Sequence, residues 1–153
     1  MENELKFILD IRGLILHSLH RGEDSGGTRN LETQKIEPRA EYGFESFLES
    51  YIVPMLETVA PRNIIAVWDG GSRFRKDIWP TYKEKRGKRV SSDFMKEQQA
   101  MLFKQTKDFL AGLGVMQMRV DGVEADDVIG LLCQKVPGPK FVYTVDADLL
   151  VLR

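Results

Sequence analysis

The sequence contains few cysteines and histidines, the residues that supply thiol and imidazole groups. Cys133 is the single cysteine among 153 residues, so no intrachain disulfide can form and no C-x-x-C motif is present. The two histidines, His17 and His20, fall within an expected first helix, and no serine or cysteine is spaced to complete a catalytic triad. These absences exclude a disulfide scaffold and are typical of a reducing cytoplasm.

The sequence also lacks long apolar runs and a strong net charge. No stretch approaches the length of about 18 apolar residues that a membrane-spanning helix needs. Near the start, Asp10 and Arg12 interrupt the apolar run, unlike the continuous apolar core of a signal peptide. With 42% hydrophobic and 29% charged residues, a chain of this length is expected to form one domain with a single core. We therefore expect a cytoplasmic protein without a membrane partner.

Four short apolar runs rich in β-branched or aromatic residues predict buried strands, at residues 5–9, 64–68, 115–118 and 141–145. Segments with helical periodicity lie between them, at residues 43–58, 92–110 and 125–135, and Ser91 or Ser92 can cap the second of these. Because the strand runs are almost continuously apolar, we expect a mostly parallel central sheet flanked by helices, an α/β fold. Residues 21–41 are predicted to be a long surface connection.

Acidic residues gather where the predicted strands end. Asp10 and Asp69 follow the first two strands, and Asp146 and Asp148 follow the fourth. After the third strand a helix is expected to begin, and three more acids stand there: Glu124, Asp126 and Asp127. Because the carboxyl ends of parallel strands meet at one edge, where ligands bind, we expect these seven acids to converge on one crevice.

Converging carboxylates repel one another and need a compensating cation. Mg²⁺ and Mn²⁺ prefer oxygen ligands, and one or two such ions can activate water and stabilise the leaving oxygen of a phosphodiester. Each acid also has a simpler interpretation, because an aspartate after a strand can form a turn or cap a helix. Acids in a first helical turn complement the helix dipole. The joint arrangement favours a metal site.

A basic segment follows Asp69 and contrasts with the acidic residues near the end of the sequence. Residues 73–89 contain eight Lys or Arg against two acids, a local charge of +6, whereas residues 121–148 carry −4. Lys and Arg attract phosphates regardless of base sequence, and the interleaved Phe74, Trp79 and Tyr82 can stack on unpaired bases. A solvated surface loop is the alternative, but the position beside Asp69 favours nucleic-acid binding.

These motifs resemble the 5′→3′ exonuclease/flap endonuclease family of phages and of the 5′ nuclease domain of bacterial DNA polymerase I. The similarity extends along the whole chain, with the motifs in matching order and spacing. It includes a strand ending in Asp10, V-W-D-G at residues 67–70, R-F-R at 73–75, W-P-T-Y-K-E-K-R at 79–86, G-V-E-A-D-D at 122–127 and T-V-D-A-D at 144–148. The E-A-D-D and F-R-x-x-x-W-P-x-Y-K-x-x-R patterns are the most specific.

The resemblance implies a PIN-like α/β nuclease that binds two divalent ions, Mg²⁺ or Mn²⁺, and DNA with 5′ single-stranded ends or flaps. The implied metal ligands are Asp10, Asp69, Glu124, Asp126 and Asp127 for the first ion and Asp146 and Asp148 for the second. The implied DNA-binding residues are Arg73, Arg75, Lys76, Tyr82, Lys83 and Arg86. Among them, Lys83 and Arg86 would contact the scissile and neighbouring phosphates, and Tyr82 would stack on or steer the substrate. Lys83, Asp126 and Asp127 are the expected catalytic residues.

Members of this family continue with two further aspartates and a DNA-gripping helix–loop–helix element, whereas this sequence ends inside an apolar segment at residues 149–152. We therefore expect residues 1–153 to be the N-terminal part of a larger or split nuclease. In that case the C-terminal DNA-binding portion is absent, and residues 70–91 form a basic arch or clamp.

The expected activity is that of a 5′-3′ exodeoxyribonuclease or flap endonuclease in DNA replication or repair, in the cytoplasm of a bacterium or a phage-infected host. Two alternatives stay open. One is a DNA-binding or assembly module that needs a second polypeptide or a C-terminal extension to become active. The other is a PIN-type ribonuclease, which uses the same metal chemistry but accounts less naturally for the basic segment.

Overall fold

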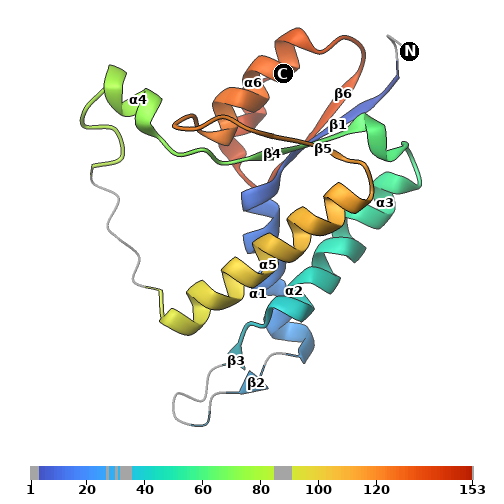
Figure 1. Ribbon diagram of the computed structural model, residues 1–153, viewed down its shortest axis with the longest axis vertical. Coiled ribbons are helices and arrows are strands. Elements are labelled where there is room, and N and C mark those ends of the chain that lie inside the picture. Colours follow the sequence, from blue (N-terminus) through green and yellow to red (C-terminus); the bar gives the residue numbers. More distant parts are fainter. Residues whose placement is uncertain (1–3, 27, 30, 32–35, 85–90, 153) are drawn as a thin grey trace.

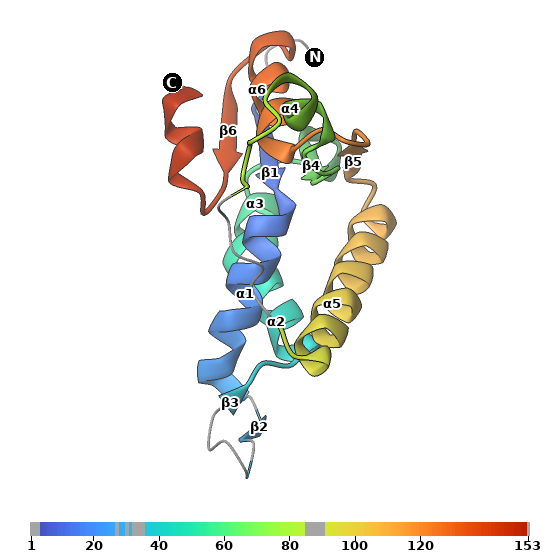
Figure 2. The same cartoon turned by 90° about the vertical axis from the view of Figure 1, so that its left-hand side faces the viewer.

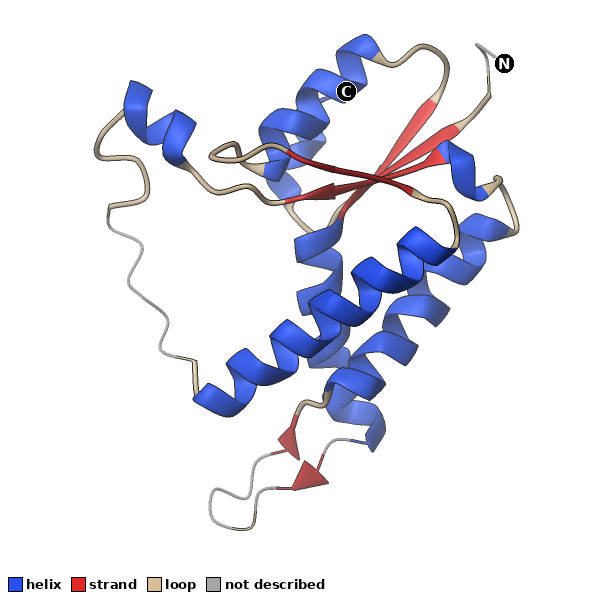
Figure 3. Cartoon of the chain, in the orientation of Figure 1, coloured by secondary structure: helices blue, strands red, loops and turns tan. Residues whose placement is uncertain are grey.

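A four-stranded sheet, all of its pairings parallel, forms the centre of the molecule (Figures 1 and 3). The computed structural model describes residues 4–26, 28–29, 31, 36–84 and 91–152. The strands are β1 (Lys6–Asp10), β4 (Ile64–Trp68), β5 (Met116–Arg119) and β6 (Lys140–Tyr143), in the order β5-β4-β1-β6. The predicted α/β class with a parallel central sheet is confirmed.

Helices cover the two faces of this sheet unequally (Figures 1 and 2). On one side lie α1 (Ile11–Gly26), α5 (Asp93–Gly112) and a continuous helical run made of α2 (Ala40–Phe47), the π-helical turn η1 (Leu48–Ile52) and α3 (Val53–Leu56). On the other side lies α6 (Ala125–Lys135). The remaining elements are short: β2 (Thr28–Arg29), β3 (Ile36–Glu37), η2 (Pro61–Asn63), α4 (Arg73–Ile78) and η3 (Ala147–Leu152).

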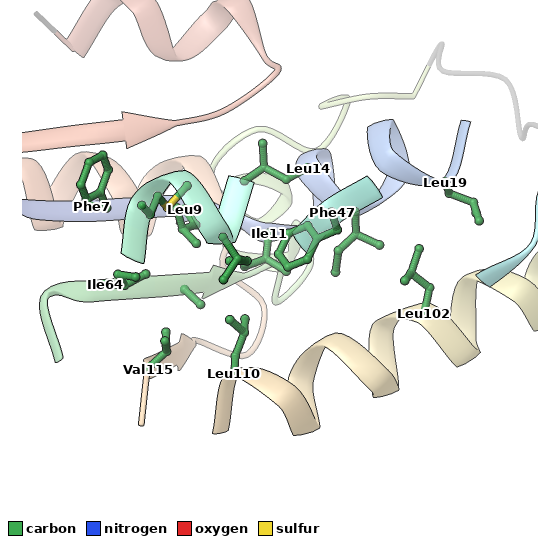
Figure 4. Packing of buried hydrophobic residues seen from close by; sticks show 14 of the residues in the cluster. Phe7, Leu9, Ile11, Leu14, Leu19, Phe47, Ile64, Leu102, Leu110 and Val115 are labelled. Atoms are coloured by element: carbon green, nitrogen blue, oxygen red, sulfur yellow. The ribbon is translucent and has the colours of Figure 1, made fainter. Parts of the chain in front are cut away.

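Alternation along β1 and β4 divides the core into two clusters. Phe7 and Leu9 of β1 point to the side of α1, α2 and α5, where they join Phe47, Leu102 and other buried residues (Figure 4). Ile8 points to the other side, where it packs with residues of β4 and α6. This separation follows from the two-residue period of a strand, which sends successive side chains to opposite faces. β4 is therefore apolar throughout, and β1 is apolar at its three central positions.

The edge strands are less covered than their apolar sequences predict. Met116 of β5 is 53% exposed and Phe141 of β6 is 58% exposed. All side chains of β5 and β6 are half-buried or exposed, whereas most of those of β1 and β4 are buried. The prediction of strands covered on both faces is wrong for these two edges.

The prediction for residues 21–41 is also wrong in part. Helix α1 continues to Gly26, and β2 pairs with β3 in a separate two-stranded antiparallel sheet at the far end of the helical layer (Figure 1). Helix α2 begins at Ala40, where the backbone N–H donates to Gln98 Oε1 at 2.8 Å. The described part of residues 21–41 therefore contains secondary structure, because local pairing and helix propagation need no apolar run. No helix in the described part of the chain is long and apolar enough to cross a membrane.

Candidate functional site

Six of the seven predicted acids line one cavity at the carboxyl edge of the sheet. The cavity has a volume of about 590 Å³. Its carboxylates are Asp10, Asp69, Glu124, Asp126, Asp146 and Asp148. Asp127 faces a neighbouring cavity that Arg75, Asp126 and Asp148 also line. The expected convergence is thus present for six acids. The seventh, Asp127, follows Asp126 in the first turn of α6.

Asp10 is the most enclosed aspartate of this group, at 8% exposure. It is the last residue of β1, and Thr144 Oγ1 donates to its Oδ2 at 3.0 Å. Burial raises the pKa of Asp10, and the charges of Asp126 and Asp146 act in the same direction against its hydrogen bonds. A Cβ at Gly13 would lie 2.8 Å from Asp10 Oδ2, so glycine at this position leaves room for the carboxylate.

Thr144 links Asp10 to the acids that follow β6. Its Oγ1 accepts from the Asp146 N–H at 2.9 Å, and Asp146 Oδ1 accepts from the Asp148 N–H at 3.0 Å. Asp146 and Asp148 are both exposed. These bonds are those of a turn, but they engage only one carboxylate oxygen of Asp146. Sequence reasoning gave Thr144 no role; its place two residues before Asp146, in the T-V-D-A-D motif, was the available signal.

The loops after β4 and β5 are joined through backbone hydrogen bonds. Gly122 N donates to Gly70 O at 2.7 Å, Gly70 N donates to Val123 O at 3.0 Å, and Phe74 N donates to Gly122 O at 2.8 Å. A Cβ at Gly70 would stand 1.8 Å from Val120 O, so only glycine permits this approach. Asp69 is held beside this junction, where its Oδ1 accepts from Gly71 N at 2.7 Å.

Arg75 of α4 pairs with three of the acids. Its Nη2 lies 2.8 Å from Asp127 Oδ1 and 3.5 Å from Asp126 Oδ2, and its Nη1 lies 2.8 Å from Glu124 Oε2. A second bond from Nε to Asp127 Oδ2, at 2.9 Å, makes the Asp127 contact bidentate. Arg75 Nη1 also donates to the Tyr82 hydroxyl. Sequence reasoning assigned Arg75 to DNA and did not foresee this pairing.

Glu124 is the buried centre of the same cluster. Lys83 Nζ lies 2.5 Å from its Oε1, and the Tyr82 hydroxyl donates to its Oε2 at 2.9 Å. Burial raises the pKa of Glu124, but the bonds from Lys83 and Tyr82 and the charge of Arg75 outweigh it, so the net shift is downward. Burial lowers the pKa of Lys83, and the bond and charge of Glu124 outweigh it, so its pKa is raised. Bonding to Asp127 is the largest of the effects that raise the pKa of Arg75.

Lys83 has a left-handed backbone, with φ of 59°. Among the described residues it is the one non-glycine position with positive φ. Such a conformation is sparsely populated for a lysine and persists where surrounding contacts hold it, commonly at functional sites. In this conformation the Lys83 side chain contacts Glu124.

The other residues predicted to bind DNA are partly described. Arg73 and Lys76 are exposed on α4, and the large side chains of Phe74 and Trp79 are 51% and 62% exposed. Arg86 lies outside the described residues, as does the rest of the predicted arch from residue 85 to residue 90. Two unforeseen residues, Arg12 and Ser72, also line the acid cavity.

The acid cavity contains the carboxylate oxygens that a divalent metal ion prefers, but they are not arranged around one point. Within the described ranges, no three acidic, histidine or cysteine side chains are grouped so that they could hold one ion. Arg75 and Lys83 supply positive charge to Glu124, Asp126 and Asp127. Asp10 differs, because burial and like charges raise its pKa and a bound cation would offset both effects. The oxygen donors therefore fit a divalent ion, whose binding would require the carboxylates to move closer together than they lie here.

Comparison with known proteins identifies the family. Residues 7–153 match the family model described as "5'-3' exonuclease, N-terminal resolvase-like domain". The chain is 32% identical to a 5'-3' exonuclease of Bacillus subtilis (strain 168), with 72% of this chain and 36% of that protein covered. It is 32% identical to a 5'-3' exonuclease of Aquifex aeolicus (strain VF5), covering 80% and 40%, and 30% identical to DNA polymerase I of Treponema pallidum (strain Nichols), covering 99% and 14%.

Solved structures share the fold. A structure of the T5 5'-exonuclease with bound zinc ions superposes with a TM-score of 0.64 at 21% sequence identity, covering 97% of this chain and 52% of that one. The T5 flap endonuclease in a pseudo-enzyme-product complex with DNA and metal ions gives a TM-score of 0.56 at 19% identity, covering 95% and 50%. The chain thus spans about half of these structures, and less than half of the bacterial relatives. It belongs to the 5'-3' exonuclease family, through the N-terminal resolvase-like domain of that family.

Proposed function

We propose that this chain forms the divalent-metal part of a 5′ nuclease that acts on DNA with 5′ single-stranded ends or flaps. The observation that carries the proposal is the cavity in which six carboxylates meet the side chains of Arg75, Tyr82 and Lys83. Carboxylates that can hold a metal ion, next to cations that can bind a phosphate, suit a metal-assisted attack on a phosphodiester. The metal ions in the solved T5 structures support the same chemistry.

The carboxylates that contact neither Arg75 nor Lys83 in the described ion pairs are the first candidates to hold Mg²⁺ or Mn²⁺. They are Asp10, Asp69, Asp146 and Asp148. Asp126 is a further candidate, because its contact with Arg75 is the longest of that side chain's three ion pairs, at 3.5 Å. When bound, such ions activate a water molecule and stabilise the leaving oxygen.

Arg75 and Lys83 can also bind the substrate once a divalent ion, in their place, balances the charge of the carboxylates that they contact. Both side chains then become available to a phosphate, which arginine binds in a bidentate manner and lysine binds as a point charge. Arg73, Lys76 and Arg86 would extend this contact along the strand, and Trp79 and Tyr82 offer rings for unpaired bases. The T5 flap endonuclease, which shares this fold, has been solved in a complex with DNA and metal ions, and this supports DNA as the ligand.

One set of observations favours a second candidate, a DNA-binding or assembly module without turnover of its own. Arg75 and Lys83 neutralise Glu124 and Asp127, and the chain covers only 36% of the Bacillus relative. Residues from another segment or polypeptide would then complete the site. The two candidates share the fold and the DNA-binding surface, and they differ in cleavage.

Cleavage of a labelled 5′-flap DNA by the 153-residue chain tests the proposal. The assay compares Mn²⁺ with EDTA, and compares Asp126→Ala/Asp127→Ala with the control Glu49→Ala/Glu57→Ala, which removes two exposed acids of the helical layer. Cleavage that needs metal and is lost only in the first variant supports the nuclease. Binding of the flap without cleavage supports the module. Preferred cleavage of an RNA flap would contradict the choice of DNA.

A further inference from the structure

A second cavity adjoins the acid cavity on the side of β5. It has a volume of about 530 Å³ and lies between β4, β5, α5 and the start of α1. Arg12 and Asp69 line both cavities, so the two lie side by side at the carboxyl edge of the sheet. Its size falls within the range of about 300–1,000 Å³ that is usual for small-ligand sites. We call it the β5 pocket.

The floor of the β5 pocket is aromatic and fixed in place. The rings of Trp68 and Phe103 are 6.2 Å apart at an interplanar angle of 55°. Trp68 Nε1 donates to Gln117 Oε1 at 2.9 Å, and Gln117 Nε2 donates to Lys107 O at 3.0 Å. This chain of bonds ties the indole of β4 through β5 to helix α5. A fixed aromatic surface costs little side-chain entropy when a flat ligand stacks on it.

The margin of the pocket is cationic. Four basic residues line it, against the single acid Asp69: Arg12, Lys104, Lys107 and Arg119. Lys104 and Lys107 are exposed on the same face of α5, and Lys104 Nζ also pairs with Asp108 at 2.6 Å. Arg119 Nε donates to Asp69 O at 3.2 Å, and its Nη1 pairs with Asp121 at 2.9 Å. An aromatic floor with a basic margin suits a nucleotide, whose base stacks and whose phosphates carry negative charge.

We propose that the β5 pocket binds one unpaired nucleotide of the nucleic-acid strand whose phosphodiester lies in the acid cavity. The base stacks on the Trp68 indole, with Phe103 beside it, and the flanking phosphates contact Lys104 and Lys107. Because Arg12 and Asp69 line both cavities, the two are close enough for neighbouring nucleotides of one strand to reach each of them. This inference depends on the proposed function for its choice of a strand, rather than a free nucleotide, as the ligand.

Trp68 reports on the pocket directly. In a Trp79→Phe background it is the only tryptophan, since the chain contains two. Stacking of a base on the indole quenches its emission. Addition of an unlabelled single-stranded oligonucleotide in EDTA should therefore quench Trp68 along a binding curve that coincides with the one from fluorescence anisotropy of the labelled strand. Deoxyadenosine monophosphate serves as the free-nucleotide arm and should quench only at much higher concentration.

The matched variants are Lys104→Ala/Lys107→Ala and Lys96→Ala/Lys135→Ala, each of which removes two exposed charges, the second pair outside the pocket. The pocket variant should bind the oligonucleotide about tenfold more weakly. For this variant, the slope of the logarithm of the binding constant against the logarithm of the salt concentration (the salt slope) should fall in magnitude by about 1.4. Each phosphate that a lysine neutralises on a single strand contributes roughly 0.7 to this slope. The control variant should change neither the affinity nor the salt slope by a comparable amount.

The outcomes separate this inference from the proposed function. Oligonucleotide binding with unchanged Trp68 emission, and equal affinities for the two lysine variants, would overturn the pocket while leaving the nuclease proposal intact. Quenching by deoxyadenosine monophosphate but not by the oligonucleotide would overturn the strand as the ligand. Loss of flap cleavage with normal Trp68 quenching would contradict the nuclease and support the pocket.

Discussion

Arg75 determines the charge balance of the candidate site at the level of single residues. It contacts Glu124, Asp126 and Asp127, and its side chain is only 27% exposed. Removal of the cation would leave partly buried carboxylates facing one another, which costs more than an exposed ion pair contributes. The same removal would leave those carboxylates available to a divalent ion.

Arg75→Gln should therefore destabilise the metal-free protein by about 2 kcal/mol, which lowers the melting temperature by roughly 6 °C for a domain of this size. Mn²⁺ should restore the melting temperature of the variant more than it raises that of the wild type. Arg62→Gln is the matched control, because Arg62 is 73% exposed and pairs with Glu4 at 3.7 Å, outside the cavity. A variant that melts like the control, with and without Mn²⁺, would show that Arg75 does not compete with the ion.

At the level of elements, the junction between the β4 and β5 loops positions α4 and hence Arg75. Its geometry depends on the close approach of Gly70 to Val120 O. Sequence reasoning could identify the acids near this junction but not the contact itself, because Arg75 and Asp127 are 52 residues apart and meet only through these loops. Short-range patterns predicted β4 and α6 with their observed bounds, since each is a periodic apolar segment with clear ends.

Gly70→Ala should destabilise the protein by about 2 kcal/mol or more, because the new methyl group would overlap a backbone carbonyl. Gly112→Ala provides the contrast. Nothing lies within 4 Å of a Cβ at Gly112, which ends α5, and alanine there should be neutral or stabilising by about 0.5 kcal/mol. Urea unfolding of both variants measures the difference. Equal midpoints for the two variants would contradict the proposed role of the junction.

Helix α5 supplies the lysines of the β5 pocket, and its start has a defined cap. Ser92 Oγ accepts from Met95 N at 3.2 Å, so Ser92, and not Ser91, is the N-cap of α5. Ser92→Ala should cost about 1 kcal/mol of stability, and Ser91→Ala should cost much less. Thermal melts of the two variants compare them under identical conditions. A larger loss for Ser91→Ala would place the cap one residue earlier.

At the scale of the whole molecule, parallel topology explains why acids distant in sequence come together. Each strand delivers its C-terminal residues to the same edge, so Asp10, Asp69 and Asp146 face one cavity although they are spread over most of the chain. This part of the site was predictable from the parallel direction of the strands and from the acids at their carboxyl ends. The ion pairs of Arg75 and Lys83 and the β5 pocket were not, because they depend on side-chain packing between elements.

Binding of a divalent cation at this carboxyl edge is the central claim. Titration of the chain with Mn²⁺, with free ion followed by electron paramagnetic resonance, tests it directly. Asp126→Asn/Asp146→Asn keeps the size of both side chains and removes two charges from the cavity, whereas Glu49→Gln/Glu57→Gln removes two charges from the helical layer. We predict saturable binding by the wild type and the control, and a loss of about tenfold or more in affinity for the cavity variant. Equal affinities for all three proteins, or no saturable binding by the wild type, would contradict the claim.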